Sequence, residues 1–229
     1  MPDHPDRPAL LARLASLAAT YGYPETAAAR LLAAAEAVLA ENERVNLTGA
    51  RDLAAAVDVL VVDSLPVGAA WPAASRTPRV AIDLGTGNGF PGLAVAMRWP
   101  DAEVVLVERR EKKARAVERV CAAVGAARAT VVACDGRELL ARRPALRGGA
   151  DLVVVRAVGP LAPTTKEAAP WLARGGRLVH WKSADVSDDE RREGLAAATA
   201  AGLVARPDVA FTVSPAHPPR LLVVYERPA

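Results

Sequence analysis

The sequence predicts an α/β fold with a seven-stranded, mostly parallel sheet, helices on both faces of that sheet, and an N-terminal helical cap. From Val80 onward, short continuous apolar segments alternate with amphipathic ones, which is typical of a parallel sheet buried on both faces. Before Val80 the apolar residues recur only at helical spacing. The first apolar segment also runs into closely spaced glycines followed by a helix, an order that is typical of a small-ligand site.

Length and composition limit the number of domains and the kinds of partner that we expect. The chain has 229 residues, of which 52% are hydrophobic, so we expect one large domain or a domain with a smaller appendage. The net charge of +3 permits a nucleic-acid partner without implying one. Two cysteines and three histidines form no zinc pattern, so no metal is expected. The polar N-terminus and the absence of a long apolar run predict a cytoplasmic protein without a membrane segment.

Residues 1–69 are expected to form the helical cap, and residues 70–229 are expected to form the second domain. Its helices are predicted at 9–20, 24–42 and 53–65, the last of them ended by Pro66.

The remaining elements alternate. Strands are predicted at 80–84, 103–107, 129–133, 152–156, 176–181, 204–213 and 221–226. Helices are predicted at 90–99, 112–124, 137–142, 163–174 and 188–201. The last two strands follow each other directly and are expected to form an antiparallel hairpin at one edge.

The glycine turn after the first strand contains Gly85, Gly87 and Gly89, with Asp83 just before it. No Gly-Lys-Ser/Thr follows, which excludes a nucleotide P-loop. Phe90 stands where a dinucleotide fingerprint needs glycine. An acid followed by three alternating glycines is typical of S-adenosylmethionine-dependent methyltransferases. The alternative is a plain structural turn between strand and helix.

Two further acids follow the next two strands. Glu108 stands 23 residues after Gly85, where a carboxylate can accept hydrogen bonds from both ribose hydroxyls of an adenosine. Asp135, with Gly136 and Arg137, follows the third strand. Its carboxylate can face the adenine amino group, cap the next helix, or do both.

Basic residues stand at the ends of later strands. Arg156 is expected where the methyl group of the cofactor meets the substrate. Lys182 ends the next strand on the same rim, with a solvated surface lysine as the alternative. A basic cluster at 109–119 is interleaved with glutamates and is expected to be an exposed helix face with i,i+4 ion pairs, not an RNA site by itself.

From about residue 42 to 227 the chain resembles the bacterial 16S ribosomal RNA guanine-N7 methyltransferases, known as RsmG or GidB (glucose-inhibited division protein B). The segments that carry the resemblance are Asn46-Leu-Thr48, Arg51-Asp52, Asp63-Ser-Leu65, Asp83 to Gly92, Arg156-Ala157, Trp181-Lys-Ser183 and Arg220-Leu-Leu-Val-Val. The Gly-Phe-Pro-Gly ending and the upstream Asn-Leu-Thr make the match more specific than a generic methyltransferase motif.

The resemblance implies a class I (Rossmann-like) methyltransferase fold that uses S-adenosyl-L-methionine to methylate N7 of a guanine in the 530 loop of 16S rRNA. The partner is then 16S rRNA or a small-subunit precursor. Residues expected at the cofactor are Asp83, Gly85, Gly87, Phe90, Glu108, Asp135, Gly136, Arg137 and Arg156. Substrate-side candidates are Asn46, Lys182 and Arg220, and no catalytic nucleophile is expected.

The chain departs from the family pattern at two places. Leu60 stands where the family usually has a histidine, and Asp135-Gly136-Arg137 stands where it usually has Arg-x-Glu. Two alternatives therefore remain open at this point. One is a related methyltransferase that acts on another RNA or a small molecule. The other is a cofactor-binding relative without activity.

Overall fold

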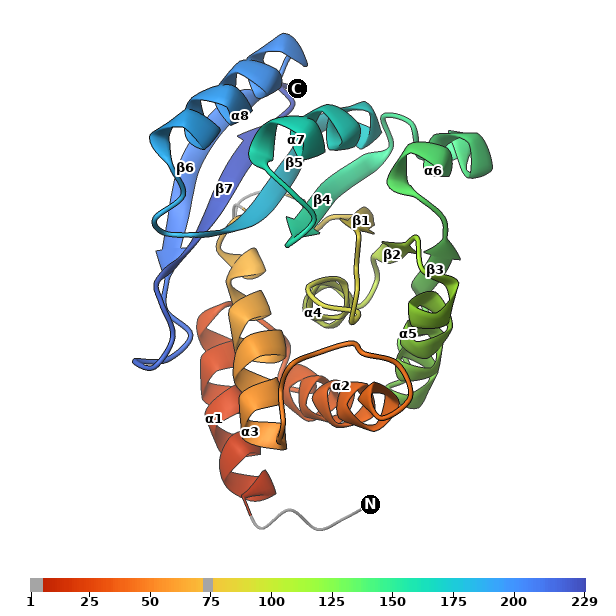
Figure 1. The fold of residues 1–229 in the computed structure, drawn as a ribbon, viewed down its shortest axis with the longest axis vertical. Helices are drawn as coiled ribbons and strands as arrows, with labels where there is room; N and C mark the ends of the chain where they lie inside the picture. Colours follow the sequence, from red (N-terminus) through yellow and green to blue (C-terminus); the bar gives the residue numbers. More distant parts are fainter. Residues whose placement is uncertain (1–5, 72–75) are drawn as a thin grey trace.

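The computed structural model describes residues 6–71 and 76–229. A sheet with the strand order β3-β2-β1-β4-β5-β7-β6 crosses the molecule (Figure 1). The strands are β1 (Val80–Leu84), β2 (Glu103–Glu108), β3 (Ala129–Ala133), β4 (Ala150–Arg156), β5 (Leu172–Ser183), β6 (Val204–Phe211) and β7 (Arg220–Glu226). Strands β1 to β5 pair in parallel, while β7 is antiparallel to both of its neighbours. The predicted seven-stranded α/β fold with an edge hairpin is confirmed.

Helices cover both faces of this sheet (Figure 1). On one face lie α4 (Gly92–Arg98), α5 (Glu111–Ala123) and the cap; on the other lie α6 (Gly136–Arg142), α7 (Leu161–Ala168) and α8 (Asp188–Ala200). Short 3₁₀ turns follow α6 (η3, Pro144–Leu146) and α7 (η4, Ala169–Trp171). Strand residues alternate between two hydrophobic clusters, so that Ala81 packs toward the cap face and Ile82 toward the opposite one.

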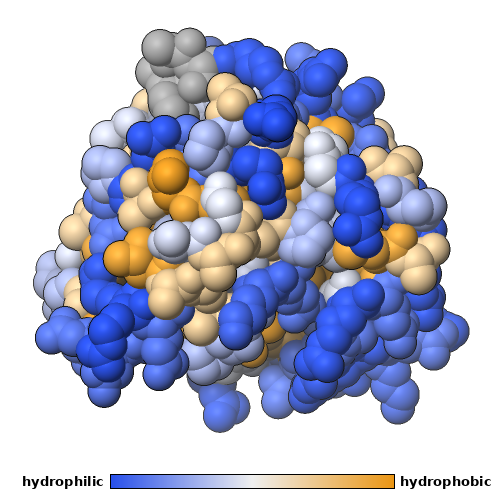
Figure 2. Space-filling view, turned by 90° about the horizontal axis from the view of Figure 1, so that it is seen from above, coloured by the Kyte–Doolittle hydropathy of each residue, from blue (hydrophilic) through white to orange (hydrophobic). Residues whose placement is uncertain are grey.

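The face covered by α6, α7 and α8 is mostly hydrophilic, with hydrophobic side chains in small separate patches (Figure 2). Large hydrophobic residues that are exposed on the described surface stand singly, among them Leu195 in α8 and Val204 in β6. The helices on this face therefore leave no large apolar surface of the sheet open to solvent. In the described ranges, no helix combines the length and apolarity needed to cross a membrane.

The cap consists of α1 (Arg7–Thr20), α2 (Ala27–Asn42) and a third segment that is not one regular helix. The sequence predicted a helix at 53–65, but α3 (Leu53–Ala56) continues as a π-helix, η1 (Val57–Val61), and a 3₁₀ helix, η2 (Val62–Gly68). Pro66 lies inside η2 and cannot donate a backbone hydrogen bond, which favours the change of helix type. The Ser64 hydroxyl donates to the carbonyl of Leu60 (2.5 Å) and stabilises this segment.

The predicted helix at 163–174 was also too long. Helix α7 ends at Ala168, and β5 begins at Leu172 after a single 3₁₀ turn. Pro170 has no N–H to continue a helix, and the buried Trp171 donates its indole N–H to the Glu167 carbonyl (2.7 Å). The chain thereby enters the sheet at Leu172, four residues before the predicted strand start at residue 176.

The division into a cap at 1–69 and a second domain at 70–229 stays a prediction, and residues 1–5 and 72–75 lie outside the described residues. One hydrophobic cluster contains fully buried residues from both parts, including Leu14, Leu31, Leu65 and Val154. The cap thus shares its core with one face of the sheet.

Candidate functional site

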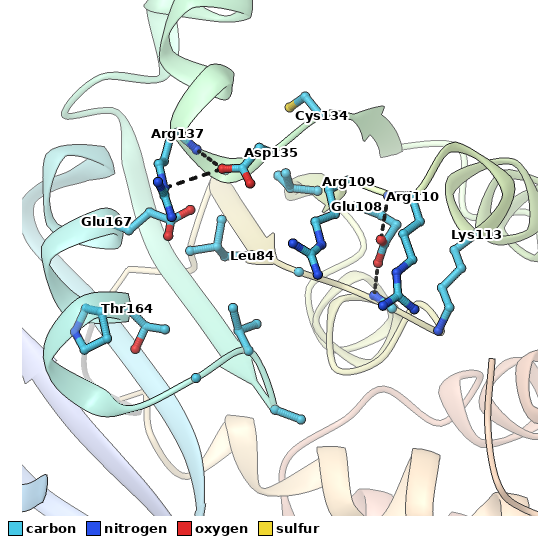
Figure 3. Close-up of a pocket in the computed structure, with 18 of the residues that line it drawn as sticks. Leu84, Glu108, Arg109, Arg110, Lys113, Cys134, Asp135, Arg137, Thr164 and Glu167 are labelled. Atoms are coloured by element: carbon cyan, nitrogen blue, oxygen red, sulfur yellow. Dashed lines mark hydrogen bonds and ion pairs between the residues drawn. The ribbon is translucent and has the colours of Figure 1, made fainter. Parts of the chain in front are cut away.

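A cavity of about 440 Å³ lies at the carboxyl ends of the central strands (Figure 3). Strand order reverses here, because β1 pairs with β2 on one side and β4 on the other, and such a reversal opens a crevice. Its walls come from the ends of β1 and β2, the turn at 134–137, the loop at 157–160 and α7, together with Arg109, Arg110 and Lys113.

The glycine turn forms one wall of the cavity without side chains. Gly85, Gly87 and Gly89 have φ values of +74°, +60° and +95°, which side-chain-bearing residues rarely adopt. A Cβ at Gly85 would lie 2.6 Å from the Val158 Cγ2 atom, whereas a Cβ at Gly87 would meet only the Gly85 carbonyl oxygen, at 3.8 Å. The backbone at Gly87 is therefore open to a ligand.

Asp83 supports this turn from below. It is buried, and its Oδ2 accepts hydrogen bonds from the Gly92 N–H (2.8 Å) and the Thr86 hydroxyl (2.6 Å). Its Oδ1 is buried and has no hydrogen-bond partner among the described residues. Burial raises the pKa of the Asp83 carboxyl to about 6, against the opposing effect of its hydrogen bonds. Asp83 does not itself line the cavity.

Glu108 joins the end of β2 to the glycine turn. Its Oε2 accepts from the Gly87 N–H (3.1 Å), and its Oε1 accepts from the Arg110 N–H (2.8 Å). The dashed lines in Figure 3 mark both contacts, and the carboxylate lies in the cavity wall. Each oxygen keeps a free lone pair that can accept a further hydrogen bond, as the expected ribose contact requires.

The turn at Asp135, Gly136 and Arg137 forms another wall (Figure 3). The Asp135 Oδ1 accepts from the Arg137 N–H (3.1 Å), so the helix-cap alternative is observed, while the adenine contact stays a prediction. A Cβ at Gly136 would lie 2.0 Å from the Glu167 Oε1 and 2.5 Å from the Leu84 Cδ1. A side chain at this position would have to displace the ends of the Glu167 and Leu84 side chains.

The wall contributed by α7 was not predicted from the sequence. Pro163, Thr164 and Glu167 line the cavity, and burial followed by the charge of Asp135 raises the pKa of the Glu167 carboxyl. No local motif marks these residues, because they belong to an ordinary amphipathic helix that tertiary packing brings to the cavity.

Phe90 and Arg156 were expected at the cofactor, but neither lines the cavity. Phe90 is buried in the hydrophobic cluster beneath the turn. The Arg156 guanidinium points to the cap, where it donates to Asp63 Oδ2 (2.9 Å), and it also donates to Asn88 Oδ1 (3.2 Å) in the glycine turn. Both residues therefore support the turn in this structure.

The three substrate-side candidates do not meet at one point. Lys182 is not a solvated surface lysine, because its ammonium group donates to the Gly159 carbonyl (2.8 Å) and pairs with Glu190 (2.5 Å). Arg220 pairs with the other oxygen of Asp63 (3.1 Å). Asn46 is exposed and lines a second hollow beside the cavity.

The chain also matches a known protein family. The family model described as "rRNA small subunit methyltransferase G" (GidB) matches residues 28–207. The chain belongs to this family. The resemblance stated from the sequence motifs is thereby confirmed.

Curated members of the family support this membership. A protein from Roseiflexus castenholzii named ribosomal RNA small subunit methyltransferase G is 35% identical over 163 residues, which cover 71% of this chain and 68% of the relative. One of the same name from Roseiflexus sp. (strain RS-1) is 34% identical over 82% of this chain and 78% of its own length.

Solved structures show the same fold. A predicted O-methyltransferase from Agrobacterium tumefaciens superimposes with a TM-score of 0.54 at 24% identity, covering 69% of this chain and 77% of that one. The fibrillarin pre-rRNA processing protein of Methanococcus jannaschii gives 0.54 at 16% identity, over 67% of this chain and 69% of that one. The predicted class I methyltransferase fold is confirmed.

Family and fold identify an S-adenosylmethionine-dependent methyltransferase, and the residues present fit that cofactor. A Cβ at Gly87 would meet only the Gly85 carbonyl oxygen, and the Glu108 carboxylate accepts from the Gly87 N–H in the same cavity wall. When bound, the cofactor supplies a methyl group on a sulfonium ion. Across the described residues, no group of three or more His, Cys, Asp or Glu side chains is placed to hold a metal ion.

Proposed function

We propose that this protein transfers a methyl group from S-adenosylmethionine to N7 of a guanine in the 530 loop of 16S rRNA. The observation that carries the proposal is the family match over residues 28–207. The partner is 16S rRNA or a precursor of the small ribosomal subunit, and we expect the reaction in the cytoplasm, where these particles assemble.

The cavity suits this chemistry. Guanine N7 carries an in-plane lone pair and no proton, so its methylation needs no general base. The titratable side chains on the cavity wall are carboxylates, one cysteine and basic groups, and no histidine is found among the described lining residues. Catalysis can then consist of holding the two reactants in line and stabilising the charge that moves onto the base.

Different residues bind different parts of the cofactor in this proposal. We assign Glu108 to the ribose hydroxyls, Asp135 to the adenine amino group, and the backbone at Gly87 to the amino-acid part of the cofactor. The position of each in the cavity wall supports the assignment. Lys182 is a positioning residue, because its bond to the Gly159 carbonyl fixes the loop that closes the cavity beyond β4.

The departure at Leu60 is compatible with this function. Leu60 is 2% exposed, packs in the cap cluster and does not line the cavity. Asp135 retains a capping role that orders its turn whichever residue the family uses there. Both changes are therefore accommodated without altering the glycine turn or Glu108.

The test is a map of N7-methylguanosine in 16S rRNA from cells with and without the gene. We expect one guanine of the 530 loop to lose its methyl group in the deletion strain and to regain it when the wild-type gene is restored. A Gly87→Asp gene should not restore it. Identical maps in both strains would contradict the proposal. Labelled methyl groups that enter only small metabolites would favour another substrate, and cofactor binding without transfer to any RNA would favour a non-catalytic relative.

A further inference from the structure

A second hollow, of about 580 Å³, adjoins the cavity, and we call it the cationic groove. Its two sides are residues 45–49, between α2 and α3, and residues 110–113, which open α5. Arg110 and Lys113 line both the groove and the cavity, so the two hollows are continuous. Figure 3 shows these two side chains extending in the same direction from the start of α5.

The positive charges of the groove are not neutralised within the described protein. Arg110, Lys112 and Lys113 make no side-chain hydrogen bond or ion pair with any described residue. Glu111, the one acid in the groove lining, is held by Arg115 at 2.5 Å.

The sequence predicts that much of the basic cluster at 109–119 forms i,i+4 ion pairs. One such pair is observed, between Glu111 and Arg115. Arg119 binds Glu41 of the cap at 2.6 Å. Three cations therefore remain together at the mouth of the cofactor cavity, where they can meet an incoming anion.

The opposite side of the groove supplies polar groups. Asn46 is exposed and Thr48 is half-buried, and both belong to the groove lining. The apolar residue between them, Leu47, is buried at 6% exposure and offers no anchor. A groove with cations, small polar groups and no exposed aromatic residue does not match the core of a protein–protein interface.

These features match a nucleic-acid backbone. Phosphate oxygens are bound by lysine, arginine and small polar side chains, and such contacts set the register of the partner without reading its sequence. Resting on the function proposed above, we infer that the cationic groove binds the sugar–phosphate backbone of the RNA next to the target guanine. The backbone would then hold the base at the mouth of the adjoining cavity.

Lys112 separates this role from cofactor binding, because it lines the groove but not the cavity. Its matched control is Lys166, an exposed lysine in α7 on the opposite face of the sheet, which also makes no ion pair with a described residue. We would compare Lys112→Gln, Lys166→Gln and a triple Arg110→Gln/Lys112→Gln/Lys113→Gln variant with wild type.

The probe is deproteinised 16S rRNA from cells that lack the gene. Its affinity is measured over a range of salt concentrations, and S-adenosylhomocysteine binding is measured by calorimetry. We expect Lys112→Gln to reduce the slope of log K against log salt by about 1, and the triple variant by about 2 to 3. Lys166→Gln should leave that slope unchanged, and Lys112→Gln should bind S-adenosylhomocysteine as wild type does.

Each outcome has one meaning. A triple variant with the wild-type slope, or a wild-type protein that does not bind the rRNA, overturns the inference. A triple variant that binds the rRNA normally but fails to bind intact small subunits also overturns it, and places a ribosomal protein in the groove. These readouts measure binding and not methyl transfer. If the variants change the salt slopes as expected but the wild-type protein transfers no methyl group, the proposed function is contradicted and the groove assignment stands.

Discussion

Gly87 and Gly125 have nearly equal positive φ values but different surroundings. Their φ values are +60° and +62°, yet Gly87 opens into the cofactor cavity while a Cβ at Gly125 would meet nothing within 4 Å. We expect Gly87→Asp to weaken S-adenosylhomocysteine binding by at least ~100-fold, because its carboxylate would enter the cavity beside Glu108. Gly125→Asp carries the same backbone strain and should bind normally. The measurement is calorimetry of S-adenosylhomocysteine binding to both variants. Equal affinities would refute the assignment of the glycine turn to the cofactor site.

Asp83 makes the stability of the protein depend on pH. Burial raises the pKa of its carboxyl from 3.8 to about 6. The folded state therefore holds this proton more tightly than the unfolded chain, and the stabilisation is complete below pH 3.8 and is lost as the pH rises through about 6.

The matching experiment is denaturant unfolding of wild type and Asp83→Asn between pH 4 and 8. Other carboxyls change stability in both proteins alike, so the difference between the two free energies of unfolding isolates Asp83. We expect wild type to lose roughly 2 to 3 kcal/mol relative to the variant across this range. A difference that does not vary with pH would mean that Asp83 is not the buried acid described above.

At the scale of the helices and strands, the sequence predicted most of what continuous apolar runs determine. The parallel strands at 80–84 and 129–133 match to the residue, because each is a short apolar segment bounded by turn residues. Periodicity could not show that the segment after Leu53 changes helix type, since π and 3₁₀ turns leave the same apolar residues on roughly the same face.

The placement of Arg156 had no local signal at all. Its partner Asp63 lies 93 residues away in η2, and Asp63 also binds Arg220 of β7. The Trp181 indole N–H completes the connection by donating to the Asp63 carbonyl (2.8 Å). One cap residue thus joins the ends of β4, β5 and β7, and Arg156 extends that link to Asn88 in the glycine turn.

Removing the Asp63 carboxylate should lower the stability of the protein, because it links the cap to the sheet. Asp63 and Arg156 have side chains only 8% and 10% exposed, so Asp63→Ala leaves a buried guanidinium without its main partner, and we expect a loss of about 3 kcal/mol. The control is Asp189→Ala, which breaks an exposed pair with Arg192 and should cost less than about 1 kcal/mol. Equal losses in chemical denaturation would exclude a structural role for the Asp63 pair.

At the scale of the whole molecule, motifs and packing contributed different parts of the site. The wall residues Gly87, Glu108 and Asp135 were predictable, because each lies at or shortly after the end of a strand, and the carboxyl ends of parallel strands meet at one edge. The cationic groove was not predictable, because it forms where the loop at 45–49 comes against the start of α5. That approach depends on α2 packing on α4 and α5, which no short segment encodes.

The cap and the sheet should therefore unfold together. Leu31 of α2 and Val154 of β4 are fully buried in one hydrophobic cluster, so removing residues 1–69 would expose a face of the sheet to water. We expect a 70–229 fragment to bind a hydrophobic dye and to lack a cooperative thermal transition.

In the full chain, Leu31→Ala should cost about 2 to 5 kcal/mol while tryptophan fluorescence and circular dichroism still report one coincident transition. Leu195→Ala, at a leucine that is 47% exposed on α8, should change stability little. A 70–229 fragment that unfolds cooperatively and binds S-adenosylhomocysteine with full affinity would show instead that the cap is a separate domain. In that case the cap would serve only to bind RNA, and it would not be needed to complete the core.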